Sequence, residues 1–561
     1  MRSRLHILRH VMKRKFGYFA REKSTFTARY TMNTQNPTIT LDKKEQQLRS
    51  LLLDVAGSLN ASGKVTEPLV LRWAGGWVRD KLLGLDSHDI DIAINAMTGE
   101  PFVEFMCEYC QRPEVIKAHD IGPDDIGNLH KIKSNPDKSK HLATAMIPIF
   151  GLELDVVNLR KESYAEDSRN PQMEFGTAEE DALRRDATIN AMFYNLNTDS
   201  VEDFTTGFAD LKAGIIRTPL EPLQTFRDDP LRVLRLVRFA SRYDFSIAPE
   251  TERFMADPSV LEALRVKISR ERVGIELEKM TKDTHPRIAL QIINRLNLYH
   301  AIFTDPAKSD ETKPDISRWP VAYDGLCEIL ANESPGSLGS VLVRGEDGKF
   351  LAWNLAAVAP WISVADPPGT KKKANALPPV GVIAREGFKA SNKLTDVMSA
   401  CHKHRLEIVE LKTAVCENAP YIQERDRFGM AIRRWNHQGG SWKLQVLGAM
   451  LVEAMEKLES WPSSISEEKV DEEAVKKRDA FIREWELFVD HLSHLEVMEA
   501  PTLRRLIDGR ELAKALGVKP GKWTGQALDI CVAWQLRNPK ATDPAPAIEE
   551  VRAKMDELGI V

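Results

Sequence analysis

Two aspartates, Asp89 and Asp91, stand two residues apart in a β-rich run and have the right chemistry to bind a metal ion. Successive side chains of a strand point to opposite faces, so both carboxylates would share one face while Ile90 and Ile92 enter the core. Such a pair offers oxygen ligands to Mg²⁺, and triphosphate oxygens can complete the coordination. Taken alone, however, an Asp-x-Asp pair is more often a solvated strand edge.

A glycine pair, Gly75-Gly76, comes before this strand and after the apolar run 69–71. Glycine lets the backbone approach a ligand closely, and a helix over 78–83 would present N–H groups and a positive dipole end to phosphate. The stretch 69–95 therefore predicts a strand, a glycine turn, a helix and a second strand. By itself the glycine pair is more often only a tight turn.

The signal becomes specific when both parts are read together, as Gly75-Gly76-x-Val78-Arg79-Asp80 followed nine residues on by Asp89-x-Asp91. This combination resembles the signature of the nucleotidyltransferase superfamily, in particular the tRNA nucleotidyltransferases, or CCA-adding enzymes, and the related bacterial poly(A) polymerases. The resemblance implies that Asp89 and Asp91 are catalytic metal ligands for Mg²⁺. It also implies that Gly75, Gly76 and Arg79 contact the nucleotide.

A third carboxylate is expected from the run 150–160, whose alternation from Leu152 to Val156 predicts a strand. Glu153 and Asp155 would share one face of it, and two-metal chemistry benefits from a third carboxylate near the attacking hydroxyl. The resemblance favours Asp155, by its place five residues before Arg160, with Glu153 as the second choice.

Adjacent arginines, Arg184 and Arg185, are followed by Asp186 in a segment that resembles the family's second motif. A guanidinium group can donate two parallel hydrogen bonds to the oxygens of one phosphate, and an aspartate can accept hydrogen bonds from ribose hydroxyls. These residues are therefore predicted to bind the nucleotide and to select NTP over dNTP.

The block 226–242 predicts one helix, with Pro230 in its first turn and a polar stripe that repeats every three residues. The stripe consists of Asp229, Arg232, Arg235 and Arg238. Such a stripe is usually a solvated face. The family's nucleotide-selecting motif, Glu-Asp-x-x-Arg, resembles 228–232, which implies that Asp229 and Arg232 read the base edge in place of a template. The resemblance also implies that the stripe arginines, Arg232, Arg235 and Arg238, bind the nucleotide and stabilise its triphosphate.

Further motifs of the family are similar to 203–214, where Asp203, Gly207 and Asp210 are predicted turn and hinge residues, and to 268–279, a helix expected to support the nucleotide site. Near the end, a Gly-Pro turn between two predicted helices resembles the tRNA-holding tail of class II enzymes. Its predicted tRNA contacts are Lys519, Gly521, Lys522 and Trp523. A plain helical hairpin explains that turn equally well.

Composition limits the other possibilities. At 561 residues the chain needs several domains, and no apolar run approaches the ~20 residues of a membrane span, which argues against a membrane protein. Six cysteines without regular spacing favour free thiols in a reducing compartment.

The basic residues are concentrated at the start of the chain. Residues 1–31 hold nine Lys or Arg and one acid, Glu22, which gives this segment a net charge of +8. Because the whole chain has a net charge of −4, the remaining residues have a net charge of −12. This segment resembles a mitochondrial presequence, with a basic RNA-touching tail as the alternative. Met12 and Met32 are possible later starts that would give cytoplasmic and nuclear forms.

The resemblance implies an α+β fold: a nucleotidyltransferase head with a mixed β-sheet, followed by an all-helical neck, body and tail. We expect helices at 43–60, 98–112, 391–415 and 442–460, a mobile loop over most of 119–144, and a flexible insertion at 461–477. The predicted parts are 1–31 (targeting), 45–215 (head), 216–290 (neck), 291–415 (body) and 416–561 (tail).

The resemblance covers about 45–290 through five ordered motifs and, more loosely, 507–540. It implies addition of C, C and A to the 3′ end of tRNA from CTP and ATP with Mg²⁺. The alternatives are a poly(A) polymerase on the same scaffold and a tRNA-binding protein without catalysis.

Overall fold

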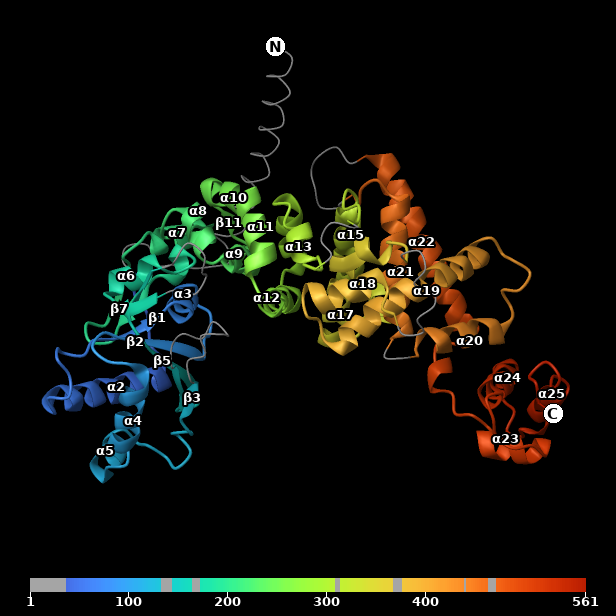
Figure 1. The fold of residues 1–561 in the computed structure, drawn as a ribbon, viewed down its shortest axis with the longest axis horizontal. Coiled ribbons are helices and arrows are strands. Elements are labelled where there is room, and N and C mark those ends of the chain that lie inside the picture. The colour runs from blue at the N-terminus through green and yellow to red at the C-terminus, as the bar shows by residue number, and fades with distance from the viewer. Residues whose placement is uncertain are drawn as a thin grey trace, which may run out of the picture. The chain divides into compact units, whose positions relative to one another are not determined.

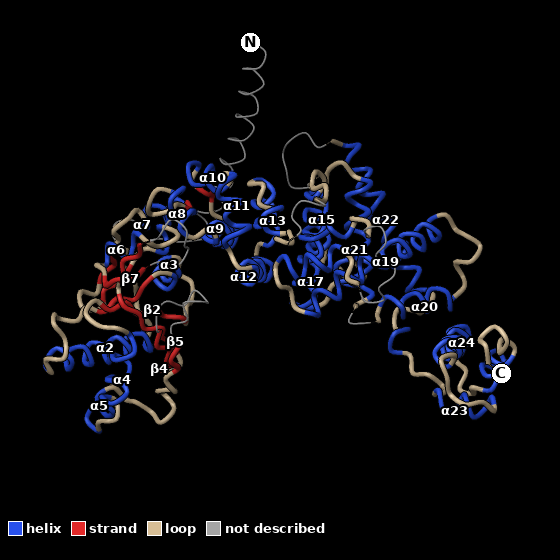
Figure 2. The backbone as a smooth tube through the Cα atoms, viewed as in Figure 1, coloured by secondary structure: helices blue, strands red, loops and turns tan. Residues whose placement is uncertain are grey.

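Contacts between residues divide the chain after Ile268 into two units. The computed structural model describes residues 37–132, 144–163, 172–307, 313–366, 376–437, 440–462 and 471–560. Within these ranges, strands occur only in the first unit and the second is built of helices (Figure 2). The predicted α+β class is thus confirmed, while the boundaries of the five predicted parts stay predictions. The predicted targeting segment lies outside the described residues.

The first unit is built around a seven-stranded sheet with the order β3-β4-β5-β2-β1-β8-β9. Only β2 and β5 pair in parallel, and all other neighbours are antiparallel, so the sheet is mixed as predicted. Its strands are β1 (Leu71–Ala74), β2 (Asp89–Ile94), β3 (His130–Ile132), β4 (Thr144–Ile149), β5 (Leu152–Asn158), β8 (Phe193–Asn195) and β9 (Ser200–Glu202). Two small ribbons are formed by β6 (Arg160–Ser163) with β7 (Gln172–Phe175) and by β10 (Ile215–Ile216) with β11 (Ser246–Ile247).

The first unit also contains helices, of which α2 packs on β1, α3 on β1 and β2, and α4 on β4 and β5 (Figure 1). They are α2 (Lys43–Ala61), α3 (Gly76–Leu82), α4 (Gly99–Tyr109), α5 (Pro113–Ala118), α6 (Ala178–Leu183), α7 (Gly207–Ala213), α8 (Pro222–Asp228), α9 (Leu231–Tyr243), α10 (Pro249–Met255) and α11 (Pro258–Lys267), with the short turn η2 (Thr188–Asn190). The strand, glycine turn, helix and strand predicted for 69–95 are therefore present.

A buried carboxylate holds α2 and α3 together. Glu45 is completely buried on α2 and closes a capping box with Asp42. Its Oε1 accepts from Trp77 Nε1 at 3.2 Å and lies 2.7 Å from Lys81 Nζ. Trp77 in turn packs edge-on against Trp73 of β1, with ring centroids 4.6 Å apart. The glycine turn between these two tryptophans is thus anchored from both sides.

Three predicted elements differ from the structure in their boundaries: a loop, an insertion and a helix. The loop expected over 119–144 contains β3, which pairs with β4; residues 133–143 lie outside the described ranges. The insertion expected at 461–477 is helical from Glu472, because Asp471 caps α22 by accepting from the N–H groups of Glu473 and Ala474. Residues 463–470 of that insertion are not among the described residues.

The helix predicted over 226–242 is two helices, α8 and α9. Asp229 between them is extended, with φ −136° and ψ 97°. The ring of Pro230 disfavours a helical conformation in the residue before it and removes one backbone donor. The predicted polar stripe is therefore interrupted between the two helices. Its aspartate lies in the extended link, and only its three arginines lie on α9.

The second unit consists of packed helices, among which α15, α17, α19 and α21 form the central group (Figure 1). Its α-helices are α12 (Arg270–Lys282), α13 (Pro286–Arg295), α14 (Tyr299–Ile302), α15 (Trp319–Ala331), α16 (Leu338–Leu342), α17 (Gly345–Ile362), α18 (Pro379–Val382), α19 (Asn392–Cys416), α20 (Arg425–Trp435), α21 (Trp442–Lys457), α22 (Glu472–His494), α23 (Gly509–Leu516), α24 (Thr524–Arg537) and α25 (Ala545–Arg552). The helices predicted at 391–415 and 442–460 correspond to α19 and α21. The predicted helix 268–279 is α12, which packs against α13 and α17; its support of the nucleotide site stays a prediction.

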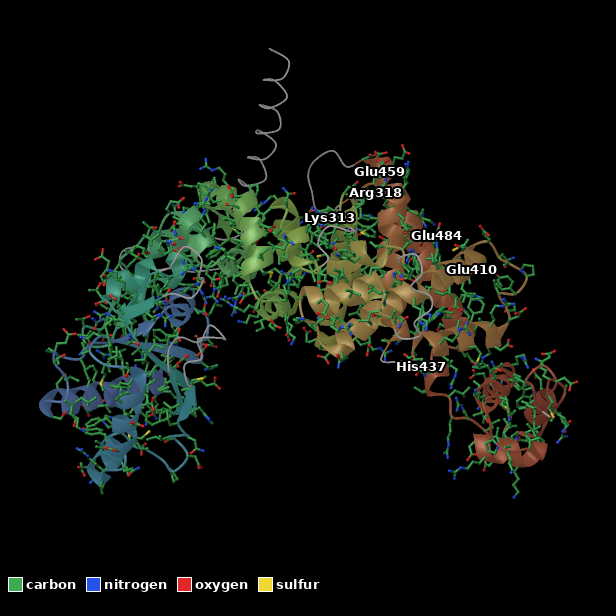
Figure 3. The ribbon with its side chains drawn as sticks, in the orientation of Figure 1. Lys313, Arg318, Glu410, His437, Glu459 and Glu484 are labelled. Atoms are coloured by element: carbon green, nitrogen blue, oxygen red, sulfur yellow. The ribbon has the colours of Figure 1, made fainter. Side chains whose placement is uncertain are left out.

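A buried lysine joins three helices of this unit. Lys412 on α19 is 1% exposed, and its Nζ lies 3.0 Å from Glu453 of α21 and 2.7 Å from Glu484 of α22. Glu484 is labelled in Figure 3. A buried cation needs such partners, so this cluster fixes how the three helices pack. The last three helices, α23 to α25, have a small core of their own around Leu512, Leu528 and Val551.

Two expectations from composition can be compared with the structure. Each of the six cysteines is a free thiol, as predicted. Among the helices of the described ranges, none has the length and apolarity needed to cross a bilayer.

Candidate active site

Three aspartates meet where β2 and β5 run side by side. The register pairs Asp91 with Asp155 and Asp89 with Glu153. Ile90 and Ile92 are fully buried on the opposite face, as the alternation predicted. Asp155 is half-buried and next to Asp91, whereas Glu153 is exposed at the outer end of the pair. The predicted catalytic carboxylates Asp89, Asp91 and Asp155 are thus brought together on one face of the sheet.

The electrostatics of this face favour a cation. Burial, and then the charges of Asp91 and Asp89, raise the pKa of Asp155 to about 6 against the opposing charge of Arg160. The pKa of Asp91 is also raised, first by burial and then by Asp89 and Asp181, against the opposing charge of Arg185. Burial and Glu153 raise the pKa of Asp89. A bound cation would relieve this crowding of negative charge.

Asp155 Oδ1 gives a second indication, because it is buried and has no hydrogen-bond partner among the described residues. Buried polar atoms are normally satisfied, so such an atom points to a missing ligand or substrate group. No group of three or more His, Cys, Asp or Glu side chains in the described ranges forms a complete metal site. Two carboxylates with substrate phosphate oxygens are, however, how proteins commonly hold Mg²⁺, so the residues fit such an ion.

The glycine turn brings the backbone against this carboxylate cluster. Gly75 has φ +69°, a conformation that side-chain-bearing residues rarely adopt. A Cβ placed on Gly75 would lie 2.7 Å from Arg185 Nη1 and 3.8 Å from Asp91 Oδ2. Gly76 follows as the first residue of α3 and lies beneath the guanidinium group of Arg79. The turn therefore needs glycine at position 75 for both conformation and space.

Gly75→Ala should lower kcat/KM for CTP at least roughly tenfold, because the methyl group would displace Arg185 and strain the turn. Gly84→Ala is the matched control, since Gly84 has φ +72° but no neighbour within 4 Å of an added Cβ. In both variants the free energy of unfolding should fall by about 1 kcal/mol, which lowers the melting temperature. Only Gly75→Ala should lose catalysis. Equal kinetic effects of the two changes would contradict the assignment.

The paired arginines are held by one buried aspartate that sequence reasoning missed. Asp181 is 1% exposed; its Oδ1 accepts from Arg184 Nε at 2.9 Å, and its Oδ2 accepts from Arg185 Nε at 3.1 Å and Nη2 at 3.0 Å. Arg184 Nη1 also donates to Glu162 at 3.0 Å. The signal was present as an acid three and four residues before two arginines on a helix. Asp181 thus fixes the two guanidinium groups beside the carboxylate cluster.

The arginines of α9 reach the same region. Arg232 is mostly buried, and its Nη2 donates to the carbonyl oxygen of Arg184 at 2.7 Å. Asp229 Oδ1 accepts from the N–H of Leu231 at 3.2 Å. Arg238 lies over the ring of Phe239, 4.5 Å from its centroid. The base-reading roles of Asp229 and Arg232 stay predictions, as does a triphosphate contact of Arg238.

Arg79, Asp186 and Arg235 are engaged with protein groups. Arg79 is 6% exposed and enclosed by Asp80 and Tyr243, which favours a structural role over the predicted phosphate contact. Asp186 Oδ2 accepts from Arg235 Nε at 2.5 Å. Burial opposes ionisation of Asp186, but Arg235 outweighs it and lowers the pKa to about 2. A ribose contact of Asp186 stays a prediction.

The third predicted motif forms a turn, as expected. Asp203 accepts from the N–H groups of Gly207 and Phe208 at the start of α7. Asp210 accepts from the hydroxyls of Thr188 and Thr206, both at 2.8 Å. This motif ties α7 to η2, and the predicted hinge role is not tested.

The predicted tRNA contacts lie on the turn between α23 and α24 in the second unit. Lys519, Gly521 and Lys522 are exposed, whereas Trp523 is half-buried against the core of α23 to α25. A hollow of about 1210 Å³ elsewhere in this unit includes His437 (Figure 3). Its lining holds four Lys or Arg and three Asp side chains, so charge does not single it out for RNA.

Comparison with known proteins agrees with this geometry. The Poly A polymerase head domain model matches residues 71–217, which include the three aspartates. The chain is 59% identical to nucleotidyltransferase lcsQ of Purpureocillium lilacinum, over 100% of this chain and 99% of that protein. It is 36% identical to the mitochondrial CCA tRNA nucleotidyltransferase of Saccharomyces cerevisiae, over 93% of this chain and 95% of the relative.

A solved structure shows the same fold. The Thermotoga maritima CCA-adding enzyme complexed with tRNA superposes with a TM-score of 0.56 at 22% identity, over 92% of this chain and 96% of that one. Members of this family generally depend on a divalent metal, which suits the crowded carboxylates. The yeast relative matches over nearly the full length of both chains. The chain therefore belongs to the class II tRNA nucleotidyltransferases, the family of the CCA-adding enzymes.

Proposed function

We propose that the protein adds C, C and A to the 3′ end of tRNA from CTP and ATP and releases pyrophosphate. The observation that carries the proposal is the placement of Asp89, Asp91 and Asp155 on one face of β2 and β5, beside the glycine turn. Near-full-length similarity to CCA tRNA nucleotidyltransferases supports this product. The relative lcsQ, named only a nucleotidyltransferase, supports the reaction type alone.

In the reaction, the terminal 3′-oxygen of tRNA forms a bond to the α-phosphorus of the nucleotide, and the bond to the β-phosphate oxygen breaks. Two Mg²⁺ ions bound through Asp89 and Asp91 would neutralise charge at the attacking and leaving oxygens. Asp155 Oδ1 accepts the hydrogen of the 3′-hydroxyl and orients it, since this atom has no other partner in the described ranges.

The arginines beside the carboxylates would hold the triphosphate. Arg184 and Arg185 are oriented by Asp181, so less conformational freedom is lost when phosphate binds. Gly75 and Gly76 supply close backbone approach. Asp229 and Arg232 would then present acceptor and donor groups to the edge of cytosine or adenine in place of a nucleic-acid template.

One incubation separates the candidate products. Purified protein is mixed with tRNA that lacks its last three nucleotides and with each labelled NTP in turn, with Mg²⁺. We expect incorporation of C, and of A after C. Tailing with A alone would support a poly(A) polymerase, which the head-domain match by itself permits. Binding without incorporation would indicate a tRNA-binding protein.

Exposed lysines of the tail turn should contribute to tRNA binding. Changing Lys519 and Lys522 together to alanine should raise KM for tRNA several-fold, with kcat unchanged. The slope of log KM against the logarithm of the salt concentration should fall by about one to two, because up to two phosphate contacts are lost. Lys476 and Lys477, two exposed lysines of α22, serve as the matched control. If both pairs have the same effect, or neither has any, the turn is only a structural hairpin.

We also propose that residues 1–31 direct import into mitochondria. Their basic, acid-poor composition supports this, and two relatives carry mitochondrial in their names. Cytoplasmic and nuclear forms would arise from starts at Met12 or Met32. Deleting 1–31 should abolish mitochondrial location of a tagged protein while purified enzyme keeps its kcat; lost catalysis would instead indicate an RNA-binding tail.

A further inference from the structure

A circuit of buried hydrogen bonds connects the helix after the glycine turn with α9. It passes from α3 through η2 and returns to α9 at two points. Its members are Arg79, Asp80, Asp186, Asn190, Arg235 and Tyr243. Five of the six are at most 8% exposed, and Arg235 alone is half-buried. We call this set the α3–α9 circuit.

On one side of the circuit, Tyr243 near the end of α9 donates its hydroxyl to Asp80 Oδ1 at 2.9 Å. Asp80 also accepts from Arg79, at 2.8 Å from Nε and 2.9 Å from Nη2. Arg79 then donates from Nη1 to Asn190 Oδ1. The ring of Tyr243 covers the Arg79 guanidinium, with 4.7 Å between the central carbon and the ring centroid.

On the other side, Asn190 Nδ2 donates to Asp186 Oδ1 at 3.2 Å, and Asp186 Oδ2 accepts from Arg235 Nε at 2.5 Å. Arg235 stands two turns before Tyr243 on α9, so the circuit holds that helix at two points about two turns apart. Arg238 lies between Arg235 and Tyr243 on α9, and Arg232 lies one turn before Arg235.

Asn190 is the member at which the direction of donation changes. A guanidinium only donates and an ionised carboxylate only accepts, so the residue between Arg79 and Asp186 must accept on one side and donate on the other. An amide does both, whereas aspartate, of the same shape, would accept from Arg79 but set a second carboxylate against Asp186. The backbone oxygen of Asn190 also accepts from Arg185 Nη1 at 3.1 Å, beside Gly75.

We propose that Asn190 is a positioning residue for nucleotide choice, which holds α9, with the predicted base-reading Arg232, in register with the glycine turn and its catalytic carboxylates. The inference rests on the proposed function, because it assumes that Arg232 reads the base. It reassigns Arg79, Asp186 and Arg235 from contacts with the nucleotide to the support of the helix that selects it.

The test is Asn190→Asp, assayed with CTP, ATP and UTP on tRNA lacking its 3′ end. The amide donor to Asp186 is lost without a change of volume, so α9 should shift relative to the turn. We expect the ratio of kcat/KM for CTP to that for UTP to fall roughly tenfold, because a mispositioned polar edge discriminates poorly. KM for tRNA should stay unchanged.

Asn195→Asp is a matched control in the same unit. Asn195 on β8 is 4% exposed, its Nδ2 donates to Glu202 at 2.7 Å, and its Oδ1 accepts from backbone N–H groups. The change therefore places a new carboxylate next to that of Glu202, outside the α3–α9 circuit. It should lower thermal stability to a similar degree and leave the CTP to UTP ratio as in the wild type.

Tyr243→Phe gives a second test should Asn190→Asp fail to fold. It removes only the hydroxyl that donates to Asp80, so the ratio should fall in the same direction by a smaller factor. If wild type is active and the folded variants keep its nucleotide ratio, or Asn195→Asp alters it equally, the inference is overturned. A wild type that transfers no nucleotide would overturn the proposed function, and the inference with it.

Discussion

Asp91→Asn should reduce addition of both C and A at least ~1000-fold while tRNA binding stays nearly intact, because metal-assisted charge stabilisation supplies several kcal/mol to the barrier. Asp91 lies between Asp89 and Asp155 across the β2–β5 register and has its pKa raised by burial and by Asp89 and Asp181. The amide keeps the shape of the side chain but removes the charge that a metal requires. Single-turnover rates and a filter-binding Kd for tRNA separate the two effects.

Asp86→Asn provides the control for that result. Asp86 is an exposed carboxylate three residues before Asp89, and its loss should leave the rate within twofold of wild type, since isolated surface charges contribute little. Near-wild-type turnover of Asp91→Asn in saturating Mg²⁺ would mean that β2 does not carry the chemistry. Comparing Asp155→Asn with Glu153→Gln in the same assay decides between the two candidates for the third carboxylate.

Arg232→Ala should damage the choice of nucleotide, with roughly a 100-fold fall in kcat/KM for CTP and ATP and a smaller fall for UTP and GTP. The change removes a donor from the proposed base edge and the hydrogen bond to the carbonyl oxygen of Arg184. Arg232→Lys should recover little, because an ammonium group cannot reproduce the planar fork. The measurement is incorporation of all four NTPs under matched conditions.

A thermal melt controls for loss of packing, since Arg232 is mostly buried. Arg253→Ala, on α10 of the same unit, is the matched comparison: its guanidinium lies over the ring of Phe254, and neither residue belongs to the α3–α9 circuit or to the hydrogen bonds of Arg232. An Arg232→Ala protein with wild-type preference among the four nucleotides would move base reading to other residues.

The local parts of the site could be predicted from the sequence because their signals are local. The Asp89-x-Asp91 alternation follows from the two-residue period of a strand, and Gly75 lies in the turn that the glycine pair predicted, with a positive φ. The strand that carries Asp155 was also readable. Its parallel pairing with β2, which sets Asp155 next to Asp91, is a long-range contact that the family resemblance suggested and periodicity could not.

The remaining features depend on tertiary contacts or on capping that overrides the pattern. The break at Asp229-Pro230 follows from proline geometry, yet the continuous polar stripe hid it. The arginines predicted as nucleotide contacts looked available in sequence. The spacing of Asp181 before Arg184 and Arg185 was a readable local signal, whereas nothing in the sequence linked Asn190 to Arg79. Side chains separated by more than 100 residues, such as Arg79 and Asn190, meet only once the sheet has formed.

Sequencing the 3′ ends of the product tests the central claim most directly. Wild-type protein and the Asp91→Asn variant are each incubated with tRNA lacking its last three nucleotides, with CTP, ATP, UTP and GTP all present and Mg²⁺ in excess. The account predicts that wild-type products end in C, C and A with no further additions, and that the variant returns the substrate unchanged. Ends carrying runs of A, or an active Asp91→Asn protein, would contradict it.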